Sequence, residues 1–145
     1  YENNTYLVPT LVAPYVIVEK GVEAGIKKDS YEKAVSTMES HIKSFKMSYE
    51  KGVKIAMGTD AGTPFNTHDM AWMELKLMIE YGMKPMDAIV SSTRNSAELL
   101  DILDDYGTIE KGKFADFLIL DENPLENIET LSKINTVYKK GVKVE

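Results

Sequence analysis

At the centre of the sequence stands the segment Gly52-Val53-Lys54-Ile55-Ala56-Met57-Gly58-Thr59-Asp60-Ala61-Gly62-Thr63-Pro64. Residues 53–57 form a short apolar run between glycines, which is typical of a strand buried on both faces. A turn follows this run, so Asp60 lies at the tip of the predicted strand. A carboxylate in this position is costly unless a metal, a basic side chain or a substrate pairs with it. For this motif alone the simpler interpretation, in which Asp60 caps the next helix or bonds within the turn, is the favoured one.

Length and composition limit the possible functions. The 145 residues, 43% of them hydrophobic, are enough for one domain with an apolar core. The net charge of −6 argues against a nucleic-acid surface, which needs clustered lysine and arginine. No apolar run approaches the roughly 20 residues that cross a bilayer, and the absence of cysteine excludes disulfides and thiolate zinc sites. We expect neither a nucleic acid nor a membrane as a partner, and the location stays open, with a preference for the cytoplasm.

Up to Tyr106 the chain alternates between strand and helix patterns. The expected elements are a strand at 6–12, a long loop or a loop with a helical turn at 13–28, a helix from 29 to 52, a strand at 53–57, and helices at 68–81, 86–92 and 95–100. Asp29 with Glu32, and Asn95 with Glu98, have the spacing of capping boxes at two of these helix starts. Strands that alternate with helices of this length predict βαβ units and a parallel sheet.

After Tyr106 the pattern becomes rich in strands. The expected elements are a strand at 114–120 and a hairpin of 134–139 and 142–144 with its turn at Lys140-Gly141. This change of composition predicts a domain boundary near Tyr106, which divides the chain into residues 1–105 and 106–145.

The two histidines have different surroundings along the chain. His41 falls on the edge of the apolar stripe of the first long helix, so a partly buried structural role is predicted. His68 lies eight residues after Asp60, at the start of a helix that Asn66 or Thr67 is expected to cap. In parallel α/β folds the loops at the carboxyl ends of strands bind ligands, so His68 is a candidate site residue. A histidine that faces solvent at a helix end is the alternative.

Asp60 and His68 are too few to form a metal site by themselves. A catalytic zinc needs three protein ligands and keeps one position for water. The chain is also short of strands, because a closed (β/α)8 barrel takes about 250 residues and two barrel-like strands are visible here.

A set of short motifs runs through nearly the whole chain. They are Val8-Pro9-Thr10-Leu11, residues 52–62, His68, residues 92–100, residues 107–120, Asn123-Pro124-Leu125 and residues 137–142. Taken jointly and in this order, they resemble the metal-dependent amidohydrolase superfamily, in its branch of imidazolonepropionase-like and Xaa-Pro dipeptidase (prolidase)-like enzymes. The resemblance implies an α/β fold in which residues 1–105 are the C-terminal part of a TIM-like (β/α)8 barrel, its last two βα units. Residues 106–145 would then be C-terminal strands of a small composite β-sandwich domain.

The resemblance also implies a catalytic role. Asp60 would contact a divalent metal, expected to be one or two zinc ions, take a proton from the metal-bound water and return it to the leaving nitrogen. His68 would lie at the pocket rim and bind the substrate, a small molecule or a dipeptide. The family's His-x-His motif, its lysine and its two further histidines are absent, so the remaining ligands would lie outside this chain. Asp69 stands where relatives often have glycine.

Two functional hypotheses follow. In the first, the chain is the C-terminal portion of a longer metal-dependent hydrolase of amide or peptide C–N bonds, prolidase- or carboxypeptidase-like, and is inactive in isolation. In the second, it is a non-catalytic module or a subunit that completes another chain's fold. Unpaired strand edges invite association, so we expect a homo-oligomer or a complex with the missing N-terminal part of the parent enzyme.

Overall fold

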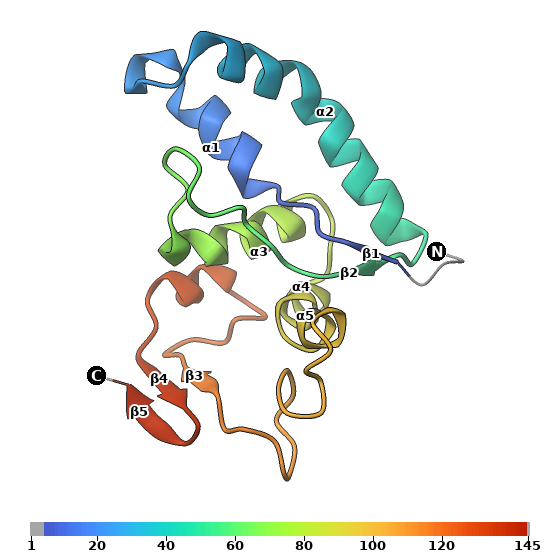
Figure 1. Ribbon diagram of the computed structural model, residues 1–145, viewed down its shortest axis with the longest axis vertical. Coiled ribbons are helices and arrows are strands. Elements are labelled where there is room, and N and C mark those ends of the chain that lie inside the picture. Colours follow the sequence, from blue (N-terminus) through green and yellow to red (C-terminus); the bar gives the residue numbers. More distant parts are fainter. Residues whose placement is uncertain (1–4, 145) are drawn as a thin grey trace.

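In the computed structural model, which describes residues 5–144, the chain is a mixed α/β protein. The helices α1 (Val12–Lys20) and α2 (Lys28–Glu50) lie at one end of the long axis and a three-stranded sheet lies at the other (Figure 1). The elements are β1 (Tyr6–Leu7), α1 (Val12–Lys20), η1 (Val22–Ala24), α2 (Lys28–Glu50), β2 (Lys54–Ile55), η2 (His68–Met70), α3 (Ala71–Glu80), α4 (Pro85–Ser92), α5 (Arg94–Leu99), β3 (Phe117–Ile119), η3 (Ile128–Ser132), β4 (Thr136–Lys139) and β5 (Val142–Val144), where η marks a 3-10 helix.

Strands β1 and β2 form a parallel pair, in which Tyr6 is aligned with Lys54 and Leu7 with Ile55. The backbone N–H of Ala56 extends the ladder by donating to the Leu7 carbonyl at 3.0 Å. Helices α1 and α2 pack against each other and lie between the two strands in the sequence. The two parallel strands are therefore joined by a helical crossover connection. The βαβ arrangement and the parallel pairing predicted from the sequence are confirmed.

Two predictions about this unit were wrong. The strand predicted at 6–12 covers only Tyr6–Leu7, and the loop predicted at 13–28 contains helix α1 and the short helix η1. Pro14 falls in the first turn of α1, where backbone N–H groups have no partner within the helix, so its ring does not interrupt the helix. Residues 12–18 are apolar throughout, which hides the helical period in the sequence.

The capping box predicted at the start of α2 does not form. The helix begins at Lys28, and its N-cap residue Lys27 makes no side-chain hydrogen bond. Asp29 lies within the first turn, and the Glu32 carboxylate instead lies 3.6 Å from the ammonium of Lys28. Both partners of this ion pair are exposed, so its contribution to stability is small.

The second predicted capping box, at the start of α5, is also absent, because its two residues hold strand β2. The amide nitrogen of Asn95 donates to the Ile55 carbonyl at 2.8 Å. The Glu98 carboxylate accepts a hydrogen bond of 2.6 Å from the ammonium of Lys54. Helix α5 thereby fixes β2 along its length.

One apolar core joins the helices to the parallel strands. Helix α4 begins at Pro85, one residue before the start predicted from the sequence, and Gly82, with φ of +105°, lies between α3 and α4. The tail is anchored to the same core, because Ile128 of η3 is buried and η3 packs on α3. The buried members are Leu11, Val12, Val16, Phe45, Ile55, Leu75, Leu77, Met78, Met83, Ala88 and Ile128.

The tail forms an antiparallel sheet in the order β3-β4-β5. The predicted hairpin is confirmed: Lys140 and Gly141 both have positive φ, +50° and +76°, as a two-residue turn between antiparallel strands requires. The strand predicted at 114–120 is shorter than expected, Phe117–Ile119. The domain boundary near Tyr106 stays a prediction. Across residues 5–144, no helix combines the length and the apolar character needed to cross a bilayer.

Candidate active site

Two loops leave the parallel strands at the same edge, residues 8–11 after β1 and residues 58–67 after β2. The two loops stay close beyond the last paired residues: a Cβ atom placed on Gly58 would lie 2.6 Å from the side-chain atom Cγ1 of Val8. This approach leaves no room for a side chain at position 58. The carboxyl ends of parallel strands are where α/β proteins bind ligands, so this edge is the candidate site.

Asp60 lies in the loop after β2 and is exposed. Its φ of +54° belongs to the left-handed region, which few residues other than glycine occupy. Hydrogen bonds reach its backbone carbonyl, whereas no donor or cation within residues 5–144 contacts its carboxylate. The next helix, η2, has Thr67 at its N-cap position, without a side-chain hydrogen bond. The interpretation in which Asp60 or Thr67 caps that helix is therefore wrong.

Asn66, the other cap candidate, is buried and organises the loop instead. Its amide nitrogen donates to the carbonyl of Thr59 at 2.5 Å and to that of Asp60 at 3.2 Å. The same nitrogen lies 3.2 Å from Oγ1 of Thr63. In the main chain, the N–H of Gly62 donates to the Asn66 carbonyl at 2.9 Å. The loop that carries Asp60 is thus held from within.

His68 is the first residue of η2 and is exposed, like the neighbouring Asp69. Within the described part of the chain no hydrogen bond or ion pair joins its ring to Asp60. The same residues contain no group of three histidine, aspartate or glutamate side chains that could hold a metal ion. Asp60 can supply one oxygen ligand to a cation, because its carboxylate is exposed and forms no hydrogen bond or ion pair with the residues between 5 and 144.

Glu74 of α3 contacts the segment that follows β1 at this edge, and the sequence did not predict this role. Its side chain is fully buried, and its carboxylate oxygens accept hydrogen bonds from the backbone N–H groups of Leu11 and Val12 at 2.9 and 2.7 Å. Burial raises the pKa of Glu74 to about 7, against the opposing effect of these N–H groups. The signal in the sequence is an acid within the apolar stretch Ala71–Leu75.

His41 of α2 holds the same segment from the other side. Its Nε2 lies 2.7 Å from the carbonyl oxygen of Pro9 and, because a carbonyl only accepts, this nitrogen carries the proton. The ring is half-buried, as expected for the structural role predicted for His41. Thr10 lies between Pro9, which His41 contacts, and Leu11, which Glu74 contacts, and has φ of +52°. Both loops at this edge therefore contain a non-glycine residue in the left-handed region.

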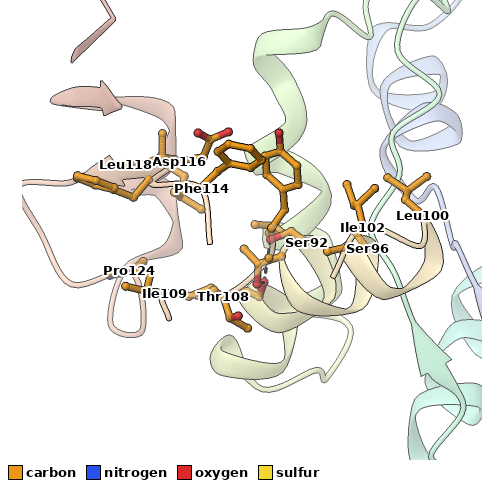
Figure 2. Close-up of a pocket in the computed structure, with 18 of the residues that line it drawn as sticks. Ser92, Ser96, Leu100, Ile102, Thr108, Ile109, Phe114, Asp116, Leu118 and Pro124 are labelled. Atoms are coloured by element: carbon orange, nitrogen blue, oxygen red, sulfur yellow. Dashed lines mark hydrogen bonds between the residues drawn. The ribbon is translucent and has the colours of Figure 1, made fainter. Parts of the chain in front are cut away.

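A separate apolar cavity of about 530 Å³ lies between α4, α5 and the tail. Figure 2 shows it between the helical segment that carries Ser92 and Ser96 and the tail segment that carries Phe114 and Leu118. Neither Asp60 nor His68 lines it. Its walls are mainly aliphatic and aromatic, so it offers a packing surface rather than reactive groups.

Comparison with known proteins identifies relatives of this chain. Residues 2–144 match the model of the amidohydrolase family. The chain is 32% identical over 128 residues to ochratoxinase from Aspergillus niger, covering 81% of this chain and 25% of that enzyme. It is 35% identical over 100 residues to imidazolonepropionase from Desulfotalea psychrophila, covering 66% of this chain and 24% of that enzyme. A solved structure of an Xaa-Pro dipeptidase with methionine bound in the active site matches with a TM-score of 0.90 and 41% identity, over 99% of this chain and 35% of the dipeptidase chain.

The chain spans about a quarter of the length of the curated relatives it matches. These relatives fall in the imidazolonepropionase-like and prolidase-like branch that the sequence motifs resemble. The likeness to the dipeptidase structure implies a fold of the TIM-barrel type, in agreement with the mixed α/β architecture. This chain belongs to the amidohydrolase family.

Proposed function

We propose that this chain is the C-terminal portion of a metal-dependent hydrolase that cleaves amide or peptide C–N bonds. In this proposal β1 and β2, with the helices that follow them, are the last two βα units of a (β/α)8 barrel. Strands β3, β4 and β5 belong to a composite β-sandwich. The parallel pairing of β1 with β2 and the likeness to an Xaa-Pro dipeptidase over 99% of the chain support this assignment.

The catalytic residue of this chain is Asp60. A bound divalent cation, with one or two zinc ions as the favoured choice, would supply Lewis-acid activation of water. Asp60 would provide one oxygen ligand, accept a proton from the attacking water and return it to the leaving nitrogen. The remaining ligands would come from residues outside this chain. Asp60 can make these contacts because its carboxylate is exposed and forms no hydrogen bond or ion pair within residues 5–144.

The substrate is a small amide or a dipeptide, and His68 contacts it at the rim. Relatives named as an Xaa-Pro dipeptidase and as ochratoxinase support a prolidase- or carboxypeptidase-like reaction. His68 is exposed and begins the first helical turn after the Asp60 loop, which suits a group that meets substrate rather than core.

The observation that carries this proposal is the exposed Asp60 carboxylate, held in a left-handed backbone at the edge where two parallel strands end. Its test is Asp60→Asn in the intact parent enzyme, assayed on a panel of Xaa-Pro dipeptides and N-acyl amino acids. We expect the variant to fold normally by circular dichroism and to lose at least about 10³-fold in turnover. Near-normal turnover would remove Asp60 from the mechanism.

The second candidate is a non-catalytic module or a subunit that completes another chain's fold. It is favoured by apolar side chains that stay exposed on the tail and near α5, including Ile109 at 93%, Val142 at 69% and Leu100 at 66%. Its partner would be the other chain whose fold it completes, or further copies in a homo-oligomer. Size-exclusion chromatography with light scattering, with hydrolase activity and metal content measured in the same fractions, tests it: a defined, inactive complex supports this candidate, and a metal-loaded active hydrolase rejects it.

A further inference from the structure

The loop at residues 58–67 holds its backbone in an unusual conformation. Asp60 has φ of +54° and Phe65 has φ of +62°, and Gly62 at +107° lies between them. Non-glycine residues keep such angles only where surrounding contacts enforce them. The direction of the Asp60 side chain depends on its backbone, so the contacts that enforce this conformation also aim the carboxylate.

Asn66 makes those contacts with its side chain, which is 1% exposed. Its Nδ2 donates to the carbonyl oxygens of Thr59 and Asp60, at 2.5 and 3.2 Å, and lies 3.2 Å from Oγ1 of Thr63. The Thr63 hydroxyl in turn donates to the Asp60 carbonyl at 3.3 Å. All three neighbours can accept a hydrogen bond, so the nitrogen of the amide has to face them.

The main chain of Asn66 completes the arrangement. Its carbonyl accepts from the N–H of Gly62 at 2.9 Å, and its N–H donates to the carbonyl of Thr63 at 3.0 Å. One buried residue therefore holds two successive carbonyl groups, those of Thr59 and Asp60, and also closes the turn that follows. An aspartate of the same size would set a carboxylate oxygen against two carbonyl oxygens, so donation by the amide is the property that matters.

We infer that Asn66 is a positioning residue that fixes the backbone of Asp60 and thereby aims its carboxylate at the reacting water. This inference rests on the proposed function. The side chain of Asn66 is buried within this loop and acts through Asp60. A displacement of about 1 Å in a catalytic group lowers a rate by about 10²-fold. Loss of the amide should therefore lower kcat while leaving KM nearly unchanged.

The test compares variants of the intact parent enzyme on the dipeptide of the panel with the highest turnover. Asn66→Ala removes the donor, and Asn66→Asp keeps the size but not the donation. Asn95→Ala is the matched control. It removes a side-chain amide that donates to the Ile55 carbonyl of β2 at 2.8 Å, and it leaves the contacts within the loop at residues 58–67 unchanged. kcat, KM and Tm are measured for each, and Asn66→Ser replaces any Asn66 variant that does not fold.

We expect both Asn66 variants to lose about 10²-fold in kcat with KM within about threefold, and Asn95→Ala to lower Tm while keeping kcat. In an Asp60→Asn background, Asn66→Ala should have no further effect on kcat, since the group that it positions is gone. Wild-type kcat in Asn66→Asp, or a full additive loss in the double variant, overturns the inference while leaving the proposed function in place. Normal turnover of Asp60→Asn alone overturns both.

Discussion

The carboxylate of Glu74 accepts a hydrogen bond of 2.7 Å from the backbone N–H of Val12, although 62 residues separate the two in the sequence. A second bond of 2.9 Å comes from the N–H of Leu11, the N-cap residue of α1, which has no side-chain cap of its own. Glu74 therefore caps α1 from α3. Since α1 follows β1 and α3 follows the Asp60 loop, this contact ties the two βα units together.

The first prediction concerns the pH dependence of stability. Burial raises the pKa of Glu74 from 4.5 to about 7 in the folded protein. The folded state then binds the Glu74 proton more tightly than the unfolded state does. The contribution of this proton to the free energy of unfolding is therefore fully present below about pH 4.5 and is lost as the pH rises through 7. The loss amounts to about 3 kcal/mol. Urea unfolding of the intact protein at pH 5 and pH 8 measures it.

Glu74→Gln is the matched variant for this measurement, because it keeps the side-chain length and one acceptor oxygen but does not titrate. We expect the free energy of unfolding of the variant to change less than that of the wild type between pH 5 and pH 8. Equal pH dependence in the two proteins would show that Glu74 does not titrate in this range.

The second prediction concerns the contact between the two strand ends. A Cβ on Gly58 would lie 2.6 Å from Cγ1 of Val8, and the β-branched side chain of Val8 has little rotational freedom to avoid it. We expect Gly58→Ala to destabilise the protein by about 1–3 kcal/mol. Adding Val8→Ala should recover much of this loss, because it removes the atom that clashes. Independent, additive effects of the two substitutions would contradict the close approach.

The third prediction separates the two histidines. His68 is exposed, so His68→Ala should change the free energy of unfolding by no more than about 0.5 kcal/mol. If His68 contacts substrate, kcat/KM should fall by about tenfold, mainly through KM. His41→Ala should instead lose about 1 kcal/mol of stability with its bond to Pro9, and should keep its kinetic constants. An unchanged kcat/KM in His68→Ala would remove it from the site.

Features encoded by neighbouring residues could be predicted from the sequence. The strand that leads to Asp60 is marked by an apolar run between glycines, and β2 lies within it. The hairpin turn at Lys140-Gly141 follows from its two residues alone. The structural role of His41 follows from its place on the edge of an apolar stripe.

Features that depend on distant contacts could not be predicted. Helix α1 is capped by Glu74, which no local pattern near Val12 reveals. Asn95 and Glu98 have the spacing of a capping box, but β2 offers them a carbonyl and an ammonium as partners, and these contacts replace the cap. Asn66 was predicted to cap the next helix because a short amide suits that position. In the structure its side chain is buried and donates to a carbonyl of its own loop instead.

The most direct test of the central claim is the position of the metal in the intact parent enzyme. Anomalous X-ray diffraction at the zinc edge would locate it. If Asp60 is a ligand, a metal peak should lie about 2.0–2.2 Å from its carboxylate, with the other ligands supplied by residues outside this chain. A metal peak remote from Asp60, or none in active enzyme, would contradict the account.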